Sequence, residues 1–116
     1  MKKSKLGEMK SVQVVTSEEE LAKVAETTPG PIVLEFVADW CDSCKAEQPE
    51  IEKLAAAGCV TVVQVDVDKA PALADKWKVE GMPTLFSAKT GSALTPESAK
   101  ELSSAAAAFK KFKCSR

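Results

Sequence analysis

The sequence contains no histidine, and neither sign of charge is in excess. Sixteen Lys and Arg residues stand against 17 Asp and Glu residues, which gives a net charge of −1. The chain therefore lacks the excess of basic residues that would indicate a nucleic-acid partner. No apolar run approaches the roughly 18 residues that a membrane-spanning helix needs, so we expect no membrane association. Internal repeats and low-complexity linkers are also lacking, and a chain of 116 residues is expected to form one domain.

The first ten residues are basic, but no apolar core follows their charges, as a secretory signal would require. We predict a flexible N-terminal tail over residues 1–10, with a short targeting peptide as the alternative. A single domain is predicted over 11–113 and a C-terminal tail over 114–116. We expect a cytoplasmic location, a reducing environment in which a pair of closely spaced cysteines is more often catalytic than structural.

Two of the four cysteines stand three residues apart in the segment Trp40–Lys45, directly after the apolar run Ile32–Ala38. At the start of a helix, residues i and i+3 are neighbours, about 5 Å apart between Cα atoms, which suits a disulfide. The unpaired N–H groups and the positive end of the helix dipole favour a thiolate on Cys41. The spacing therefore predicts a dithiol–disulfide exchange site, with Cys41 as nucleophile and Cys44 as resolving thiol.

Zinc binding is one alternative for these cysteines, and a purely structural disulfide is another. A four-cysteine zinc site normally contains two C-x-x-C pairs, whereas Cys59 and Cys114 are isolated and far apart in the sequence. A disulfide that closes so short a loop removes little entropy from the unfolded chain. Both alternatives are therefore disfavoured, and we expect no bound metal.

The other two cysteines carry separate expectations. Cys59 is expected to pack as a small apolar residue at the start of a strand. Cys114 lies among the cations Lys110, Lys111, Lys113 and Arg116, which favour its thiolate. We expect a monomer with an accessible thiol at Cys114. A dimer linked through Cys114 is the alternative.

The remaining pattern predicts alternating strands and helices. Strands are expected over 12–15, 32–38, 60–67 and 84–87, and a turn at 89–91. Helices are expected to open at Ser17, at Cys41, at Pro71 and at Thr95-Pro96. In the last of these helices, Leu102, Ala106 and Phe109 would form the apolar face. This order implies a three-layer α/β domain with a mixed sheet.

Four segments at matching spacings resemble the thioredoxin family. They are the strand and turn over Leu34–Cys41, Pro49 five residues after Cys44, the acidic strand end Asp66–Asp68, and the loop Gly81–Thr84. The resemblance runs from Val12 to Gly91. It implies the thioredoxin fold, a central mixed sheet flanked by helices. The last strand is expected to be shortened or missing, because only Ser92–Leu94 precede the expected final helix.

The resemblance implies a protein-disulfide reductase that needs no cofactor. In the family, the first cysteine forms a mixed disulfide with a disulfide-containing protein, and the second cysteine resolves it. A thioredoxin reductase or another dithiol donor then restores the dithiol. The alternative function is a redox-sensing or binding module of the same fold with little turnover.

The resemblance also assigns roles to four further residues. Glu35 takes the place of a buried carboxylate that moves protons for the second cysteine, and burial would raise its pKa. Trp40 is expected to form a partly exposed platform beside Cys41. Pro83 is expected to follow a cis peptide bond, and the backbone of Met82 is expected to pair with the substrate chain.

Two positions within this site depart from the family pattern. Gln64 stands where the family has a lysine near the buried acid, so we expect the proton-transfer step to be tuned differently. Asp42-Ser43 stands where thioredoxins most often have Gly-Pro. Asp42 opposes a thiolate at Cys41, while Lys45 and the helix terminus favour it. The sequence therefore leaves open whether the couple is a reductant or an isomerase-like oxidant.

Overall fold

The computed structural model describes residues 12–88 and 94–114. The predicted tail over 1–10 and the predicted turn at 89–91 lie outside the described residues. The order of elements is β1 (Gln13–Val15), α1 (Glu18–Thr27), β2 (Ile32–Val37), α2 (Asp42–Ala57), β3 (Thr61–Asp66), α3 (Pro71–Lys76), β4 (Thr84–Ala88), β5 (Lys100–Leu102) and α4 (Ala105–Lys111). The elements predicted up to β4 are confirmed, with boundaries that shift by one or two residues.

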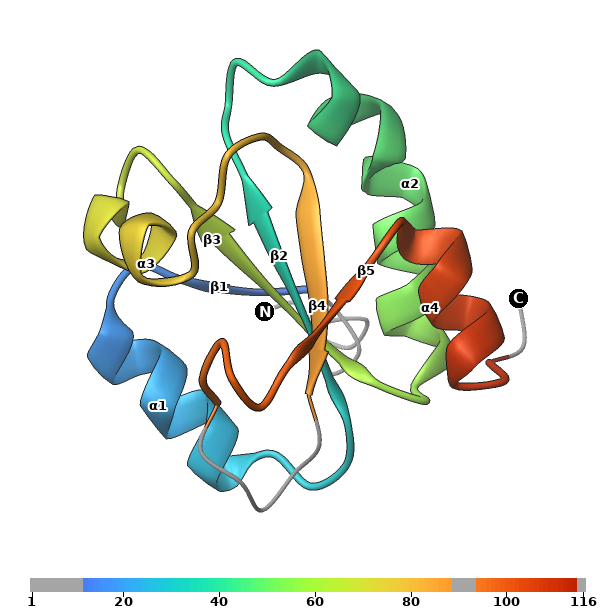
Figure 1. Ribbon diagram of the computed structural model, residues 1–116. Coiled ribbons are helices and arrows are strands. Elements are labelled where there is room, and N and C mark those ends of the chain that lie inside the picture. Colours follow the sequence, from blue (N-terminus) through green and yellow to red (C-terminus); the bar gives the residue numbers. More distant parts are fainter. Residues whose placement is uncertain (1–11, 89–93, 115–116) are drawn as a thin grey trace, which may run out of the picture.

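The five strands form one mixed sheet in the order β1-β3-β2-β4-β5. The central strand β2 pairs in parallel with β3 and antiparallel with β4. Helices α1 and α3 lie on one side of the sheet, and α2 and α4 lie side by side on the other (Figure 1). The predicted three-layer α/β domain with a mixed sheet is therefore confirmed.

Strand β2 has no solvent-facing side, because helices cover both faces of the sheet. Leu34 and Phe36 point into the core beneath α1 and α3, while Val33 points into the core beneath α2 and α4. Phe36 also packs against Trp77 and Phe86, with ring centroids 5.9 and 6.0 Å away. A strand covered on both faces reads as a continuous apolar run, which explains the composition of Ile32–Ala38.

Local signals set the ends of the longer helices. The Ser17 side chain accepts a hydrogen bond from the Glu20 N–H at 3.1 Å and so caps α1, as predicted. The Glu20 carboxylate turns back to the Thr16 N–H, one residue earlier than a capping box requires. Helix α2 ends at Gly58, whose φ of 78° lies in the left-handed region that glycine adopts without a steric penalty.

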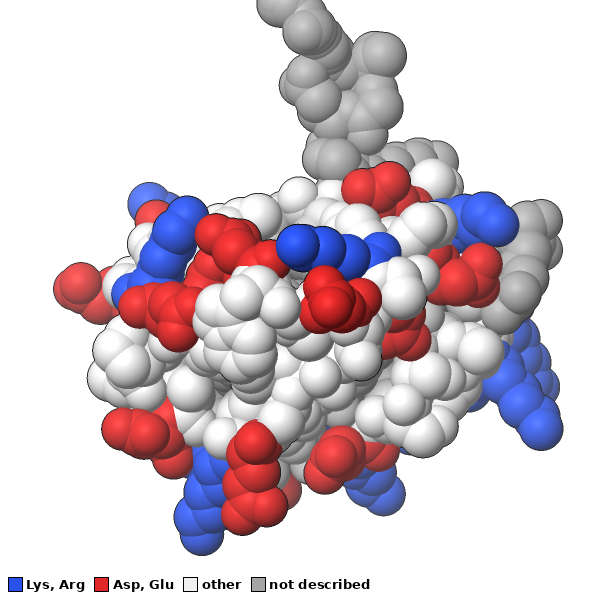
Figure 2. Space-filling model, turned by 90° about the horizontal axis from the view of Figure 1, so that it is seen from above, with Lys and Arg blue, Asp and Glu red and all other residues white. Residues whose placement is uncertain are grey.

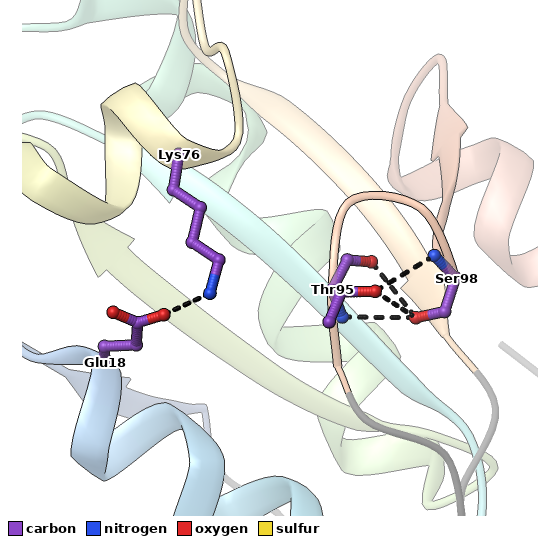
Figure 3. Close-up of polar contacts among 4 residues, drawn as sticks. All are labelled: Glu18, Lys76, Thr95 and Ser98. Carbon is purple, nitrogen blue, oxygen red and sulfur yellow. Dashed lines mark hydrogen bonds and ion pairs between the residues drawn. The ribbon is translucent and has the colours of Figure 1, made fainter.

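The C-terminal region differs from the prediction. Residues Thr95–Ser98 form a turn, in which the Ser98 hydroxyl contacts the backbone and side chain of Thr95 (Figure 3). The final helix begins instead after the cap Ser104, whose side chain accepts a hydrogen bond from the Ala107 N–H at 3.2 Å. The sequence Thr-Pro opens turns as readily as helices, so this local signal alone misplaced the helix start.

The last strand was expected to be shortened or missing, and the structure shows that it is present but short. Residues Lys100–Leu102 pair antiparallel with β4. Leu102 therefore belongs to β5 and not to the apolar face of the final helix, while Phe109 is buried on α4 as expected. Pairing with β5 also satisfies backbone N–H and C=O groups on the outer edge of β4.

An exposed ion pair joins helices α1 and α3, which cover one face of the sheet. The Lys76 ammonium on α3 contacts the Glu18 carboxylate on α1 (Figure 3). Exposed pairs of this kind contribute at most about 1 kcal/mol. The buried side chains of Leu21 and Leu73, which pack against the sheet, are therefore the main attachment of this layer.

Cys59 packs against the apolar core as expected, but a disulfide to Cys114 replaces the accessible thiol that was expected there. Their Cα atoms lie 5.8 Å apart, although 55 residues separate them in the sequence. Cys59 follows α2 and Cys114 follows α4, so the side-by-side packing of these helices brings the two thiols together. While this bond is intact, Cys114 is neither an accessible thiol nor able to link a dimer. In the part of the chain that the structure describes, no group of three or more Cys, Asp or Glu side chains is placed to hold a metal ion.

Among the described residues, no helix is long and apolar enough to cross a bilayer.

Candidate active site

The two cysteines of the C-x-x-C motif lie at the start of α2, beyond the carboxyl end of β2. Cys41 is the N-cap residue, and Cys44 lies in the first helical turn. They form a disulfide with a Cα–Cα distance of 5.3 Å, as the spacing predicted. Their side chains are buried, with exposed fractions of 6% and 5%.

The helix terminus surrounds the Cys41 sulfur with groups that favour negative charge. The Cys44 N–H donates a hydrogen bond to Cys41 Sγ over 3.1 Å. The positive end of the α2 dipole points at the same atom. A sulfur that accepts a backbone hydrogen bond at a helix N-terminus is stabilised as a thiolate, so the start of α2 favours a thiolate on Cys41 when the disulfide is reduced.

The loop before β4 lies against this sulfur. The Met82 carbonyl oxygen is 3.5 Å from Cys41 Sγ, and the Met82 side chain packs on the cluster of Ala38, Cys41 and Cys44. The Met82–Pro83 peptide bond is cis, which confirms the geometry that the resemblance implied. The backbone of Met82 is thus placed beside the reactive sulfur.

Trp40 forms an exposed surface next to the motif. Its side chain is 64% exposed, and its indole N–H donates a hydrogen bond of 2.8 Å to Asp68 Oδ2. Asp68 follows β3, and its own N–H is held by Asp66 Oδ1. The indole ring is therefore fixed by the neighbouring strand end, which confirms that Trp40 is not a core residue.

Glu35 is fully buried in the middle of β2, with no exposed surface. Gln64, its register partner on β3, donates a hydrogen bond of 2.6 Å to Glu35 Oε1. Among the described residues, nothing bonds to Glu35 Oε2. Burial raises the pKa of Glu35 from 4.5 to about 7, against a lowering by the Gln64 hydrogen bond and with a smaller increase from the negative charge of Glu47. A carboxyl group with this pKa can exchange a proton near neutral pH.

A cavity of about 240 Å³ lies between Cys44 and Gln64, the hydrogen-bond partner of Glu35. Its lining includes Cys44, Gln48 and Gln64. A larger cavity of about 560 Å³, between α1 and α3, touches none of the four cysteines. The smaller cavity therefore belongs to the site, and it brings in Gln48, which sequence reasoning missed. The signal was present, because Gln48 follows Cys44 by four residues and so shares its helix face.

The intervening pair Asp42-Ser43 is exposed, and so is Lys45. Figure 2 looks onto the end of the molecule where α2 begins, and it shows acidic and basic side chains interspersed with uncharged surface. Solvent screens opposing charges at such positions, so this face carries no extended field of one sign.

Comparison with known proteins agrees with this geometry. Residues 11–112 match the family model described as Thioredoxin. The chain belongs to the thioredoxin family. It is 38% identical to the thioredoxin of Chlamydia trachomatis over 81 residues, which span 69% of this chain and 76% of that protein. With the thioredoxin of Rhodospirillum rubrum it shares 36% identity over 85 residues, which span 72% and 78% of the two chains.

Solved thioredoxin structures superimpose over most of the chain. A mutant thioredoxin from Halobacterium salinarum aligns with a TM-score of 0.76 and 27% identity, covering 90% of this chain and 89% of that one. Oxidised mitochondrial thioredoxin 3 from Saccharomyces cerevisiae aligns with a TM-score of 0.72 and 30% identity, covering 88% and 93%. The fold is the thioredoxin fold. The chain is accordingly a thiol-disulfide oxidoreductase of the protein-disulfide reductase type, and this family acts on disulfide-containing proteins.

Proposed function

We propose that Cys41 attacks disulfides in partner proteins, that Cys44 resolves the mixed disulfide, and that Glu35 accepts the proton that Cys44 loses. The observation that carries this assignment is the placement of Cys41 Sγ at the N-terminus of α2, where the Cys44 N–H donates to it. The sulfur stabilised as a thiolate is the better nucleophile. Cys44, one helical turn further on, is the thiol that remains to resolve the intermediate.

The chemistry proceeds in two exchanges. The Cys41 thiolate attacks one sulfur of the partner disulfide, so that a Cys41–partner bond forms and the other partner sulfur leaves as a thiolate. The Cys44 thiolate then attacks Cys41 Sγ, which forms the Cys41–Cys44 disulfide and releases the second partner sulfur. The partner gains two electrons and the chain loses two. A dithiol donor, such as a thioredoxin reductase, must return them before the next turnover.

Glu35 fits the proton step because its pKa lies near neutrality. When Cys44 is a thiol, it must lose its proton before it can attack. The ionised Glu35 carboxylate can take this proton, and the cavity lined by Cys44 and Gln64 lies between the thiol and the Glu35–Gln64 pair. Burial of the proton acceptor keeps its pKa above that of an ordinary carboxyl group.

Recognition of the partner is proposed to use backbone contacts and an apolar surface. The Met82 backbone lies beside Cys41 Sγ and can pair with an extended segment of the partner. Trp40 offers an exposed aromatic surface on which such a segment can pack. Pro83 follows Met82 through the cis peptide bond and lies in the same loop. Since charges of both signs are interspersed around this end of the molecule (Figure 2), we expect acceptance of varied partner sequences.

We further propose that the chain works as a monomer in the cytoplasm, as part of the electron transport that maintains redox balance there. Reducing compartments supply the dithiol donors that this cycle consumes. Trapping of cellular thiols by rapid alkylation would test the location, since a cytoplasmic pool should be recovered largely with Cys41 and Cys44 reduced. Recovery with both cysteines oxidised would point to an oxidising compartment.

Reduction of insulin in the presence of dithiothreitol separates an active reductase from a redox-sensing module. An active reductase accelerates insulin precipitation catalytically, whereas a sensing or binding module leaves the dithiothreitol rate unchanged. A Cys41→Ser variant provides the matched control, because it keeps the fold and removes the nucleophile.

The order of the two cysteines has its own test. A Cys44→Ser variant can form the mixed disulfide but cannot resolve it, so it should accumulate a covalent adduct with insulin chains. Mass spectrometry under non-reducing conditions detects this adduct, and a Cys41→Ser variant should show none. An adduct on Cys44 of the Cys41→Ser protein, with none on Cys41 of the other, would reverse the assignment.

A further inference from the structure

Glu35 is the inner end of a chain of polar side chains that reaches the surface of α2. Gln64 Nε2 donates to Glu35 Oε1 over 2.6 Å and to Gln48 Oε1 over 2.8 Å. Gln48 Nε2 in turn donates to Glu52 Oε2 over 3.2 Å. The bonds to Gln48 and Glu52 are of normal hydrogen-bond length, and the bond to Glu35 is slightly shorter. The buried carboxyl group is thus connected to exposed Glu52 through two amides.

Gln48 Oε1 and Glu35 Oε1 both accept hydrogen bonds from Gln64 Nε2, so Gln48 favours the orientation in which the amide nitrogen faces Glu35. The Gln64 NH₂ group has two hydrogens, and one bonds to each of the two acceptors. If the Gln48 oxygen were absent, the Gln64 amide would lose the partner that favours this orientation. Rotated by half a turn, it would present its own oxygen to Glu35, which an ionised carboxylate cannot bond.

Gln48 also faces the resolving thiol. It lines the cavity of about 240 Å³ together with Cys44, Gln64 and Lys45. Cys44 and Gln48 lie on the same face of α2, four residues apart. Gln48 therefore lines the cavity between Cys44, which loses a proton in the proposed step, and Gln64, which bonds to the proposed acceptor Glu35.

We propose that Gln48 is a positioning residue of the resolution step, which acts through Gln64 to keep a hydrogen-bond donor on Glu35. The inference rests on the proposed role of Glu35 as proton acceptor. Gln48 does not touch Glu35 itself. Two neutral amides thus support the buried acid at the position where the family resemblance implies a lysine.

The charged groups around Glu35 favour an uncharged substitution as the test. Helix α2 contributes Glu47, which raises the pKa of Glu35 and whose carboxylate accepts the Ala105 N–H. Strand β4 places apolar Leu85 opposite Glu35, and β3 places Gln64 there. The side chains of α4 that pack on this core are apolar, and its lysines, Lys110 and Lys111, lie at its C-terminal end. A change from Gln48 to Leu alters none of these charges.

The test is the pH dependence of the resolution rate in Gln48→Leu, with insulin as the disulfide probe. Loss of the ordered donor should raise the pKa of Glu35 and move the acidic limb of the profile to higher pH. A shift of about half a pH unit lowers the ionised fraction about threefold below the pKa. We therefore expect resolution about threefold slower near pH 6, and unchanged where Glu35 is fully ionised. Gln13→Leu, an exposed change on β1, should leave the profile of the wild type intact.

A double-mutant comparison separates positioning from general damage. In a Glu35→Gln background no carboxyl group titrates at position 35, so Gln48→Leu should have no further pH-dependent effect. A uniform slowing at every pH, the same effect in both backgrounds, or no effect at all would overturn the inference.

An NMR titration of the Glu35 carboxyl carbon tests the positioning without turnover. If wild type fails to reduce insulin but Gln48→Leu still raises the pKa of Glu35 in this titration, the proposed function fails and the positioning role of Gln48 stands. An unchanged pKa of Glu35 refutes the positioning role.

Discussion

At the scale of single residues, the chain places an acid where folding opposes its ionisation. Glu35 has one oxygen bonded to Gln64 and one without a partner among the described residues, inside a strand that is covered on both sides. Desolvation outweighs the Gln64 hydrogen bond, and the pKa rises to about 7. A carboxyl group whose pKa lies near 7 is useful for proton transfer, but its ionised form lowers the stability of the folded state.

Replacement of Glu35 by Gln should therefore stabilise the folded protein at high pH. Because the folded pKa lies above 4.5, the folded state binds more protons than the unfolded state between pH 4.5 and about 7. Wild-type stability falls over this window and stays low above it. Relative to their difference near pH 4, we expect Glu35→Gln to gain on the order of 3 kcal/mol over wild type near pH 8. Urea unfolding at both pH values measures this, and exposed Glu101→Gln should show no such change.

At the scale of elements, local signals predicted most of the architecture and failed in one region. The apolar run of β2, the cap at Ser17 and the C-x-x-C motif at the start of α2 are all local patterns, so the sequence sufficed for them. The start of α4 was wrong, because Thr95-Pro96 opens a turn and the pairing of β5 with β4 depends on residues far away. Gln64 was predicted to matter, but its bond to Gln48 joins two elements and is not visible in either one.

The cap of α4 offers a test of this revised helix boundary. Ser104 accepts the Ala107 N–H through its side chain, so Ser104→Ala should destabilise the fold by about 1 kcal/mol. The adjacent Ser103 is exposed and outside the helix, so Ser103→Ala serves as the matched control with little effect. Thermal unfolding of both variants decides the point. If Ser104→Ala were as stable as Ser103→Ala, Ser104 would not be the residue that caps α4.

At the scale of the whole molecule, the second disulfide ties the last helix to the rest of the domain. Cys114 is joined to Cys59 across a loop of 55 residues, and the Cys114 N–H donates to the Phe109 carbonyl over 2.9 Å. Helix α4 packs on α2, and Glu47 of α2 also accepts the first N–H of α4. The pairing could not be predicted from spacing, because it follows from the packing of these two helices.

A Cys59→Ser/Cys114→Ser double variant should lose stability without losing the reactive couple. Loop-closure entropy for a loop of this length amounts to about 4 kcal/mol. Urea unfolding of the oxidised proteins measures the loss, and the insulin assay should show that the Cys41–Cys44 centre still turns over. An unchanged midpoint would mean that the bond constrains the unfolded chain very little.

The same disulfide changes how many electrons the chain can hold. With Cys41–Cys44 and Cys59–Cys114 both reduced, one molecule carries four thiols and can release four electrons, twice the number that the reactive couple needs. A titration against a redox buffer should therefore resolve into two two-electron transitions wherever the two potentials differ. The Cys59→Ser/Cys114→Ser variant assigns each transition to a cysteine pair, because it retains only the Cys41–Cys44 transition that drives catalysis.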